Sequence, residues 1–170
     1  MRLQVACVSI ALSALVVLPP NVATAEPAGF PDLNTFADVP AQAYIQKWPR
    51  SAPTVSFSTE EGINCGFGAP ETPNEDNQFA FCDGPLPGLQ NVPARGSGPC
   101  DIGSVNSFGI SHTQGACEDA RPNWKILSPG HKLSYGNITC AVGRGPVVAC
   151  VERIAHKRGF VLQPSGSFVF

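Results

Sequence analysis

Six cysteines lie outside the first 25 residues, and along the chain they form three neighbouring couples: Cys65/Cys82, Cys100/Cys117 and Cys140/Cys150. A seventh, Cys7, lies inside an apolar leader. An even number of cysteines behind a leader is typical of an exported chain, because disulfides are stable in oxidising compartments. We therefore expect a protein that is secreted or located in the cell envelope and held together by disulfide bonds.

Residues 1–25 have the three parts of a secretory signal peptide: a positive start, an apolar run, and the cleavage site Ala23-Thr24-Ala25. This pattern predicts a mature chain that begins at Glu26. A retained membrane anchor is the alternative, but the apolar run has only about 16 residues, whereas a spanning helix needs roughly 20. No later stretch is long and apolar enough, so we expect no membrane span after signal cleavage.

The size and composition of the mature chain predict one folded, loop-rich domain. Residues 26–170 suit a single modest core. Glycine and proline together make 34 of the 170 residues, which is above ordinary usage but below the level typical of disorder.

Charge is divided unevenly along the chain. Residues 26–119 hold three Lys/Arg against twelve Asp/Glu, and residues 120–170 hold seven against one. The two halves can simply attract each other or solvate two faces. The alternative is an anion-binding patch that includes Arg144, Arg153, Lys157 and Arg158. Basic residues are scattered without interleaved aromatic residues, so we do not expect nucleic acid as a partner.

Short apolar runs between turn residues predict an all-β domain over residues 54–170. Val55–Ser58 alternates between apolar and polar residues, which places Val55 and Phe57 on one face. The other candidate strands are 63–67, 78–82, 107–110, 124–127, 132–135, 138–142, 147–152, 159–163 and 167–170. We expect an antiparallel meander that forms a small sandwich or a partly open barrel.

Residues 26–53 contain five prolines and predict an N-terminal arm outside this β domain. Alanine and glutamine favour a helical turn near Ala41–Lys47, bounded by the flanking prolines. The arm also carries apolar residues, from Phe30 to Trp48, that a free tail would not need. We expect the arm to lie on the core.

The best-defined element is a hairpin in which Cys140 and Cys150 flank the turn Gly143–Pro146. Opposed residues of antiparallel strands bring their Cβ atoms to about 4.5–5.5 Å, close to disulfide range. We therefore expect these two cysteines to be bonded, and the same geometry favours Cys65 with Cys82. Spacing alone does not select one connectivity, so a crossed pair such as Cys82–Cys140 stays an alternative.

Two segments resemble each other. Gly62-Ile63-Asn64-Cys65 matches Gly136-Asn137-Ile138-Thr139-Cys140, and each is followed by a second cysteine. This predicts a weak internal repeat of a disulfide-stapled hairpin.

No metal or cofactor is predicted. The cysteines lack C-x-x-C spacing and belong to an exported chain, which disfavours zinc. The carboxylates Glu71, Glu75 and Asp76 share one loop, but their spacing matches no EF-hand. We expect a solvated acidic loop in place of a calcium site.

Several of these motifs resemble a known family. The segment Phe57 to Cys65 is similar to the strand that opens small exported actinobacterial domains. The closing pattern of that family resembles Tyr135–Cys140, Cys150, Gly159–Leu162 and 165–170, and the arm around Phe30–Leu33 is similar to that of mycobacterial secreted members. Glu60 departs from the proline that the family often has.

The resemblance implies export, β structure and the sequential disulfides Cys65–Cys82, Cys100–Cys117 and Cys140–Cys150. Members of this family have no established activity, and similar domains occur alone or outside membrane-anchored kinases. The resemblance therefore implies no catalytic residue.

The chain shows no catalytic motif. Ser111 and His112 are neighbours, and neighbours in a strand point to opposite faces. His131 and His156 are the remaining histidines, and no Gly-x-Ser-x-Gly elbow occurs.

The sequence therefore predicts a secreted, non-catalytic protein that binds an extracellular or cell-envelope partner. The alternatives are a small secreted hydrolase with a site assembled across the fold, and a purely structural envelope protein. A histidine that meets an aspartate and a serine or cysteine in one pocket would favour the hydrolase. An exposed aromatic or basic patch would favour binding.

Overall fold

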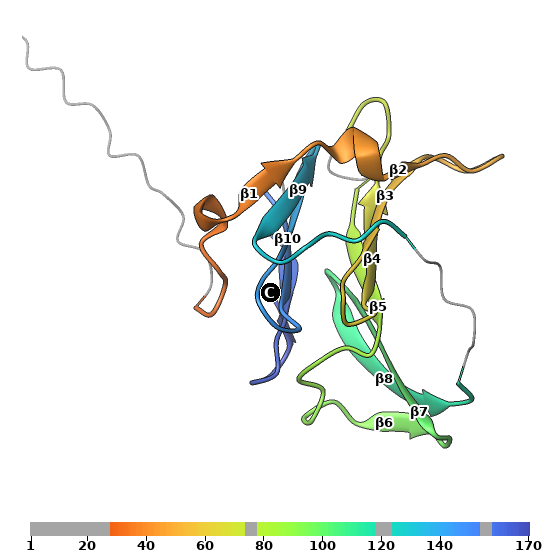
Figure 1. Cartoon of the computed structure of the whole chain (residues 1–170). Helices are drawn as coiled ribbons and strands as arrows, with labels where there is room; N and C mark the ends of the chain where they lie inside the picture. The colour runs from red at the N-terminus through yellow and green to blue at the C-terminus, as the bar shows by residue number, and fades with distance from the viewer. Residues whose placement is uncertain (1–27, 74–77, 118–123, 154–157) are drawn as a thin grey trace, which may run out of the picture.

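The computed structural model describes residues 28–73, 78–117, 124–153 and 158–170. These residues form two β-sheets that pack face to face (Figure 1). One sheet has six strands in the order β1-β9-β10-β11-β12-β13, and the other has seven in the order β2-β3-β4-β5-β7-β8-β6. The all-β prediction is confirmed, and of its alternatives the sandwich is the one observed.

The strands of the six-stranded sheet are mostly short. They are β1 (Ala37–Val39), β9 (His131–Tyr135), β10 (Ile138–Val142), β11 (Val148–Glu152), β12 (Gly159–Leu162) and β13 (Phe168–Val169). β10 and β11 are buried at every residue because both of their faces are covered. One face meets the other sheet, and the opposite face is covered by Leu33 of the arm, which packs with Ala141 and Val151.

The seven-stranded sheet contains the two longest strands. Its members are β2 (Ile45–Gln46), β3 (Thr54–Ser58), β4 (Asn64–Gly68), β5 (Ala80–Gly84), β6 (Ala94–Gly96), β7 (Cys100–Asn106) and β8 (Gly109–Gly115). β7 and β8 pair along their whole length as an antiparallel hairpin. This hairpin forms one side of the sheet, with only the three-residue β6 beyond it (Figure 1).

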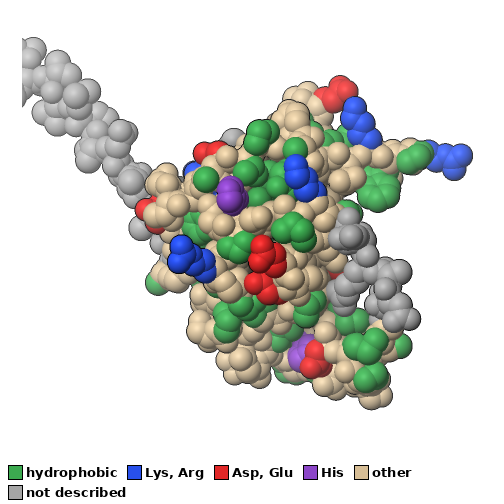
Figure 2. All heavy atoms as spheres, viewed as in Figure 1, with side chains coloured by type: hydrophobic (Ala, Val, Ile, Leu, Met, Phe, Trp, Pro, Cys, Tyr) green, Lys and Arg blue, Asp and Glu red, His purple; other side chains and the backbone are tan. Residues whose placement is uncertain are grey.

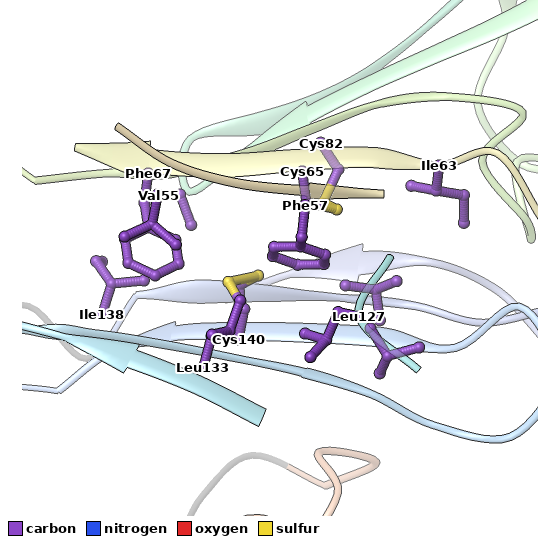
Figure 3. Close-up of a cluster of buried hydrophobic side chains, with 14 of the residues drawn as sticks. Val55, Phe57, Ile63, Cys65, Phe67, Cys82, Leu127, Leu133, Ile138 and Cys140 are labelled. Atoms are coloured by element: carbon purple, nitrogen blue, oxygen red, sulfur yellow. A yellow bond between two sulfur atoms is a disulfide. The ribbon is translucent and has the colours of Figure 1, made fainter. Parts of the chain in front are cut away.

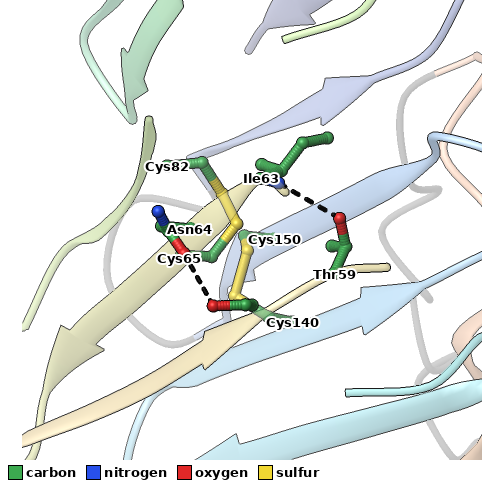
Figure 4. Close-up of a disulfide and its surroundings, with 8 residues drawn as sticks. Thr59, Ile63, Asn64, Cys65, Cys82, Cys140 and Cys150 are labelled. Atoms are coloured by element: carbon green, nitrogen blue, oxygen red, sulfur yellow. Dashed lines mark hydrogen bonds between the residues drawn. A yellow bond between two sulfur atoms is a disulfide. The ribbon is translucent and has the colours of Figure 1, made fainter. Parts of the chain in front are cut away.

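The core is built on two matching rows of buried side chains, one row from each sheet. Residues at paired positions on four adjacent strands form the rows Phe57–Cys65–Cys82–Val105 and Leu133–Cys140–Cys150–Phe160. The two disulfides face each other between the sheets (Figures 3 and 4). The predicted internal repeat is thus present, and it extends from a hairpin to four strands of each sheet.

All three cysteine couples are bonded as predicted. Cys65 lies directly opposite Cys82 and Cys140 directly opposite Cys150, with Cα–Cα distances of 4.0 and 4.1 Å. Cys100 and Cys117 are bonded at the open end of the β7–β8 hairpin, with a Cα–Cα distance of 5.1 Å. The crossed alternative is wrong, because Cys82 is bonded to Cys65 and Cys140 is bonded to Cys150.

The N-terminal arm contributes to both sheets. A 3-10 turn η1 (Leu33–Thr35), capped by the Asp32 side chain, precedes β1, and β1 joins the edge of the six-stranded sheet. The predicted helical turn is shorter than expected: η2 (Ala41–Tyr44) ends before Ile45, which pairs with Val55. Sheet pairing of a β-branched residue here outweighs local helix preference.

Three strand predictions differ from the structure. β7 and β8 were not predicted, and the candidate strand 107–110 contains the turn between them. Their glycine, serine and asparagine give a weak strand pattern that pairing with β5 overrides. The candidate 124–127 makes only one bridge, from Ile126 to Ser58. The meander is not wholly antiparallel, since β1 and β6 join their neighbours in parallel.

Candidate binding site

The loop of the β7–β8 hairpin has only two residues, Ser107 and Phe108, because Asn106 pairs directly with Gly109. The Asn106 side-chain oxygen accepts a hydrogen bond from the Phe108 N–H at 2.8 Å, which is a typical asparagine-capped turn. The other end of the hairpin is closed by Cys100–Cys117. The β7–β8 hairpin is therefore fixed at both of its ends: the Asn106 hydrogen bond fixes the turn, and the disulfide joins the two strands at the opposite end.

The turn presents an aromatic ring to solvent. Phe108 is 71% exposed, the largest value among the exposed large apolar residues that the structure describes. The Arg158 guanidinium, which precedes β12 in the other sheet, lies over this ring at 5.4 Å from its centroid. We call residues 106–109 together with Arg158 the hairpin tip.

A shallow hollow of about 320 Å³ adjoins the hairpin tip. Its lining comes from both hairpin strands and consists of Ser104, Asn106, Phe108, Gly109, Ile110 and Ser111. Ser104 and Ser111 are exposed and stand opposite each other across β7 and β8. The hollow therefore offers hydroxyl and amide groups beside one aromatic ring.

A second, larger hollow of about 560 Å³ lies between the same hairpin and residues 85–94. Leu86 packs on Gly103, where a Cβ atom would lie 2.6 Å from the leucine Cγ. The remaining wall is mainly proline, leucine and valine, with His112 and Asp101 as its ionisable residues.

His112 connects the hairpin to the wall of this second hollow. Its Nε2 lies 3.2 Å from an Asp101 carboxylate oxygen, and its Nδ1 lies 3.1 Å from the Val92 carbonyl oxygen. The His112 side chain is 16% exposed and that of Asp101 is 66% exposed. Both partners are hydrogen-bond acceptors, so only the protonated ring can donate to the two of them together.

The second hollow contains a histidine and an aspartate in contact, which are two of the three residue types of a serine-protease triad. No serine, threonine, cysteine or lysine is among its described lining residues. The histidine–aspartate pair therefore lacks an adjacent nucleophile. In contrast, the hairpin tip meets the criterion for binding, since it combines an exposed aromatic ring with an arginine.

The structure separates the residues of the predicted anion-binding patch. Arg144 lies in the turn between β10 and β11, whereas Arg153 and Arg158 lie beyond the opposite end of β11. Lys157 lies outside the described residues. On the face shown in Figure 2, Lys and Arg side chains stand singly among acidic and apolar ones. Of the described members of this patch, Arg153 and Arg158 lie at the same end of the sheet and Arg144 lies at the other.

Of the other ionisable residues that the sequence singles out, Glu71 and His131 lie within the described ranges. The His131 Nδ1 lies 3.1 Å from the Ser128 carbonyl oxygen, while His156, Glu75 and Asp76 lie outside the described residues. Within the part of the chain that is described, no three His, Cys, Asp or Glu side chains are placed to hold a metal ion.

The hairpin tip was not predicted from the sequence. Phe108 was assigned to a candidate strand, where it would have been counted as a core residue. The sequence feature that could have predicted the turn is Asn106-Ser107-Phe108-Gly109, because asparagine and glycine favour turns. The approach of Arg158 has no local signal, because the two residues are 50 positions apart and meet only through packing of the sheets.

Comparison of the chain with protein-family models, with curated proteins and with solved structures finds no match. The resemblance to exported actinobacterial domains therefore stays a prediction. Across the described ranges, no helix is long and apolar enough to cross a membrane.

Proposed function

We propose that the protein is secreted and acts without catalysis, by binding a partner at the cell envelope or outside the cell, as a member of an actinobacterial family of disulfide-rich domains. The observation that carries this proposal is the hairpin tip: a 71% exposed phenylalanine at the end of a fully paired hairpin. Aromatic residues are enriched at binding interfaces and among the residues that contribute most to binding.

Rigidity supports the same proposal. The Cys100–Cys117 bond and the Asn106 cap hold the tip before any partner arrives. A preorganised surface loses less conformational freedom on binding than a flexible loop does.

A secreted hydrolase is the second candidate, and the His112–Asp101 pair favours it. A hydrolase of this kind needs a nucleophile beside the imidazole, or a water that the imidazole activates. Both ring nitrogens of His112 already face acceptors within the protein, and neither faces a hydroxyl. We therefore rank binding above hydrolysis.

The test is a binding isotherm of the secreted protein on cell-envelope preparations, with Phe108→Ala as the variant. We expect saturable binding that weakens on the order of tenfold, because an aromatic anchor contributes about 2 kcal/mol or more. Trp48→Ala is the matched control, since Trp48 is also an exposed aromatic residue, at 50%, and lies between β2 and β3, away from the hairpin tip. Equal loss in both variants, or no saturable binding, would overturn the proposal.

A further inference from the structure

The hairpin tip gathers three kinds of group that contact a ligand in different ways. The Phe108 ring supplies a flat apolar surface, and Arg158, which lies over one face of this ring, supplies a positive charge and leaves the opposite face for stacking. The Asn106 oxygen is occupied by the Phe108 N–H, but its amide nitrogen has no hydrogen-bond partner among the described residues. The exposed hydroxyl groups of Ser104 and Ser111 lie along the same hollow.

We propose that the hairpin tip binds an acidic glycan, an inference that rests on the proposed binding function and names its ligand class. A sugar ring has one face of C–H groups that packs on an aromatic ring, and a rim of hydroxyl groups that needs donors and acceptors. The aromatic ring, the amide and the serines match this division of apolar and polar surface.

The arginine indicates that the glycan is acidic. Arg158 is exposed and forms no ion pair with the described residues, so its charge is available to a ligand. A guanidinium binds carboxylate or sulfate through two parallel hydrogen bonds, which are stronger than bonds between neutral groups. An anionic sugar stacked on Phe108 would place such a group beside Arg158.

The shape of the hollow favours a glycan over a peptide. Peptide and protein anchors insert into desolvated apolar pockets, but this hollow is shallow and lined mainly by serine, asparagine and glycine. Its volume of about 320 Å³ is near the lower end of ligand sites, which suits a short stretch of a chain. An acidic peptide added beside Gly109–Ser111, the part of β8 that β6 does not pair with, is the competing occupant, and the experiment separates the two.

The experiment titrates the secreted protein, with its disulfides intact, with four probes of similar length. These are an oligogalacturonate, a sulfated dextran oligosaccharide, a neutral malto-oligosaccharide and an oligoglutamate peptide. We expect at least one acidic oligosaccharide to bind on the order of tenfold more tightly than the neutral sugar and the peptide, since hydrogen bonds between charged groups are stronger than those between neutral ones and tenfold corresponds to about 1.4 kcal/mol. The two acidic sugars distinguish carboxylate from sulfate recognition.

Variants assign the binding to the hairpin tip. We expect Phe108→Ala and Arg158→Gln each to weaken binding of the acidic oligosaccharide on the order of tenfold. Trp48→Ala and Arg144→Gln are matched controls that remove an exposed ring between β2 and β3 and an exposed arginine between β10 and β11, and we expect them to leave affinity unchanged. Raised salt should weaken binding of wild type more than that of Arg158→Gln.

Three outcomes would overturn the inference: equal affinity for acidic and neutral sugars, tighter binding of oligoglutamate, or equal loss in the control variants. If no sugar binds while envelope binding still depends on Phe108, the glycan inference fails and the proposed function stands. If envelope binding is also independent of Phe108, both fail.

Discussion

The bonds Cys65–Cys82 and Cys100–Cys117 join residues the same distance apart in the chain, 17 positions, but they lie in different surroundings. The first is fully buried between the sheets and faces Cys140–Cys150. The second joins a half-buried cysteine to an exposed one at the open end of the β7–β8 hairpin. Because the loops match, the two bonds restrict the unfolded chain equally in the chain-entropy account.

Any difference in how much the two bonds stabilise the protein must therefore come from their contacts in the folded state. The buried bond lies in a row with Phe57 and Val105 and is part of the packing of the core. The exposed bond packs little and instead holds a hairpin that carries the tip. We therefore expect the buried couple to contribute to the core and the exposed couple to act mainly on the β7–β8 hairpin.

The largest effect is expected from the double variant Cys65→Ala/Cys82→Ala. It removes a loop closure that contributes about 3 kcal/mol and also leaves unfilled space in a close-packed core. We expect a loss near the upper end of the range of about 2–5 kcal/mol observed for native disulfides. Urea unfolding measures this loss, and a loss no greater than that of the exposed pair would remove the contrast.

A smaller effect is expected from Cys100→Ala/Cys117→Ala. This variant loses the same loop term of about 3 kcal/mol at most, without disturbing the core. Hydrogen exchange should show faster exchange in β7 and β8 and unchanged protection in β10 and β11. Uniformly faster exchange in all four strands would mean that the hairpin and the sandwich unfold as one unit.

The smallest effect on stability is expected from a change at Tyr44, which packs in the same core as the two buried disulfides. Its hydroxyl donates to the Ile126 carbonyl at 3.1 Å, and burial raises the pKa of its phenol. The folded state thus favours the neutral phenol. The stability that this provides is present below about pH 10, the usual pKa in an unfolded chain, and is lost as pH rises through the folded pKa.

Tyr44→Phe should therefore lose about 1 kcal/mol at neutral pH, the contribution of one hydrogen bond. Its unfolding free energy should then fall less than that of wild type as the pH rises above about 10. Tyr135→Phe, which removes a similar bond to the Pro70 carbonyl, is the matched control at neutral pH. Parallel alkaline curves for wild type and Tyr44→Phe would contradict the assigned role.

The candidate site was much less predictable than the fold. The sequence identified the basic residues around position 158, but it grouped Arg158 with Arg144, which the structure places at the other end of β11. It placed Phe108 inside a strand and gave no sign that this ring meets Arg158. It excluded Ser111 as a partner of His112 and left a site assembled from distant residues open, but it did not indicate that His112 meets Asp101 on the adjacent strand.

What the sequence determined by itself was local: most of the short strands, the cysteine couples and the repeat of a stapled hairpin. These follow from side-chain alternation, turn residues and the short reach between opposed strand positions. The tertiary structure decided which strands share a sheet, that the two buried disulfides face each other, and that the arm supplies an edge strand to each sheet. These features depend on packing between segments that are far apart in the chain, and a local sequence pattern does not predict which surfaces pack together.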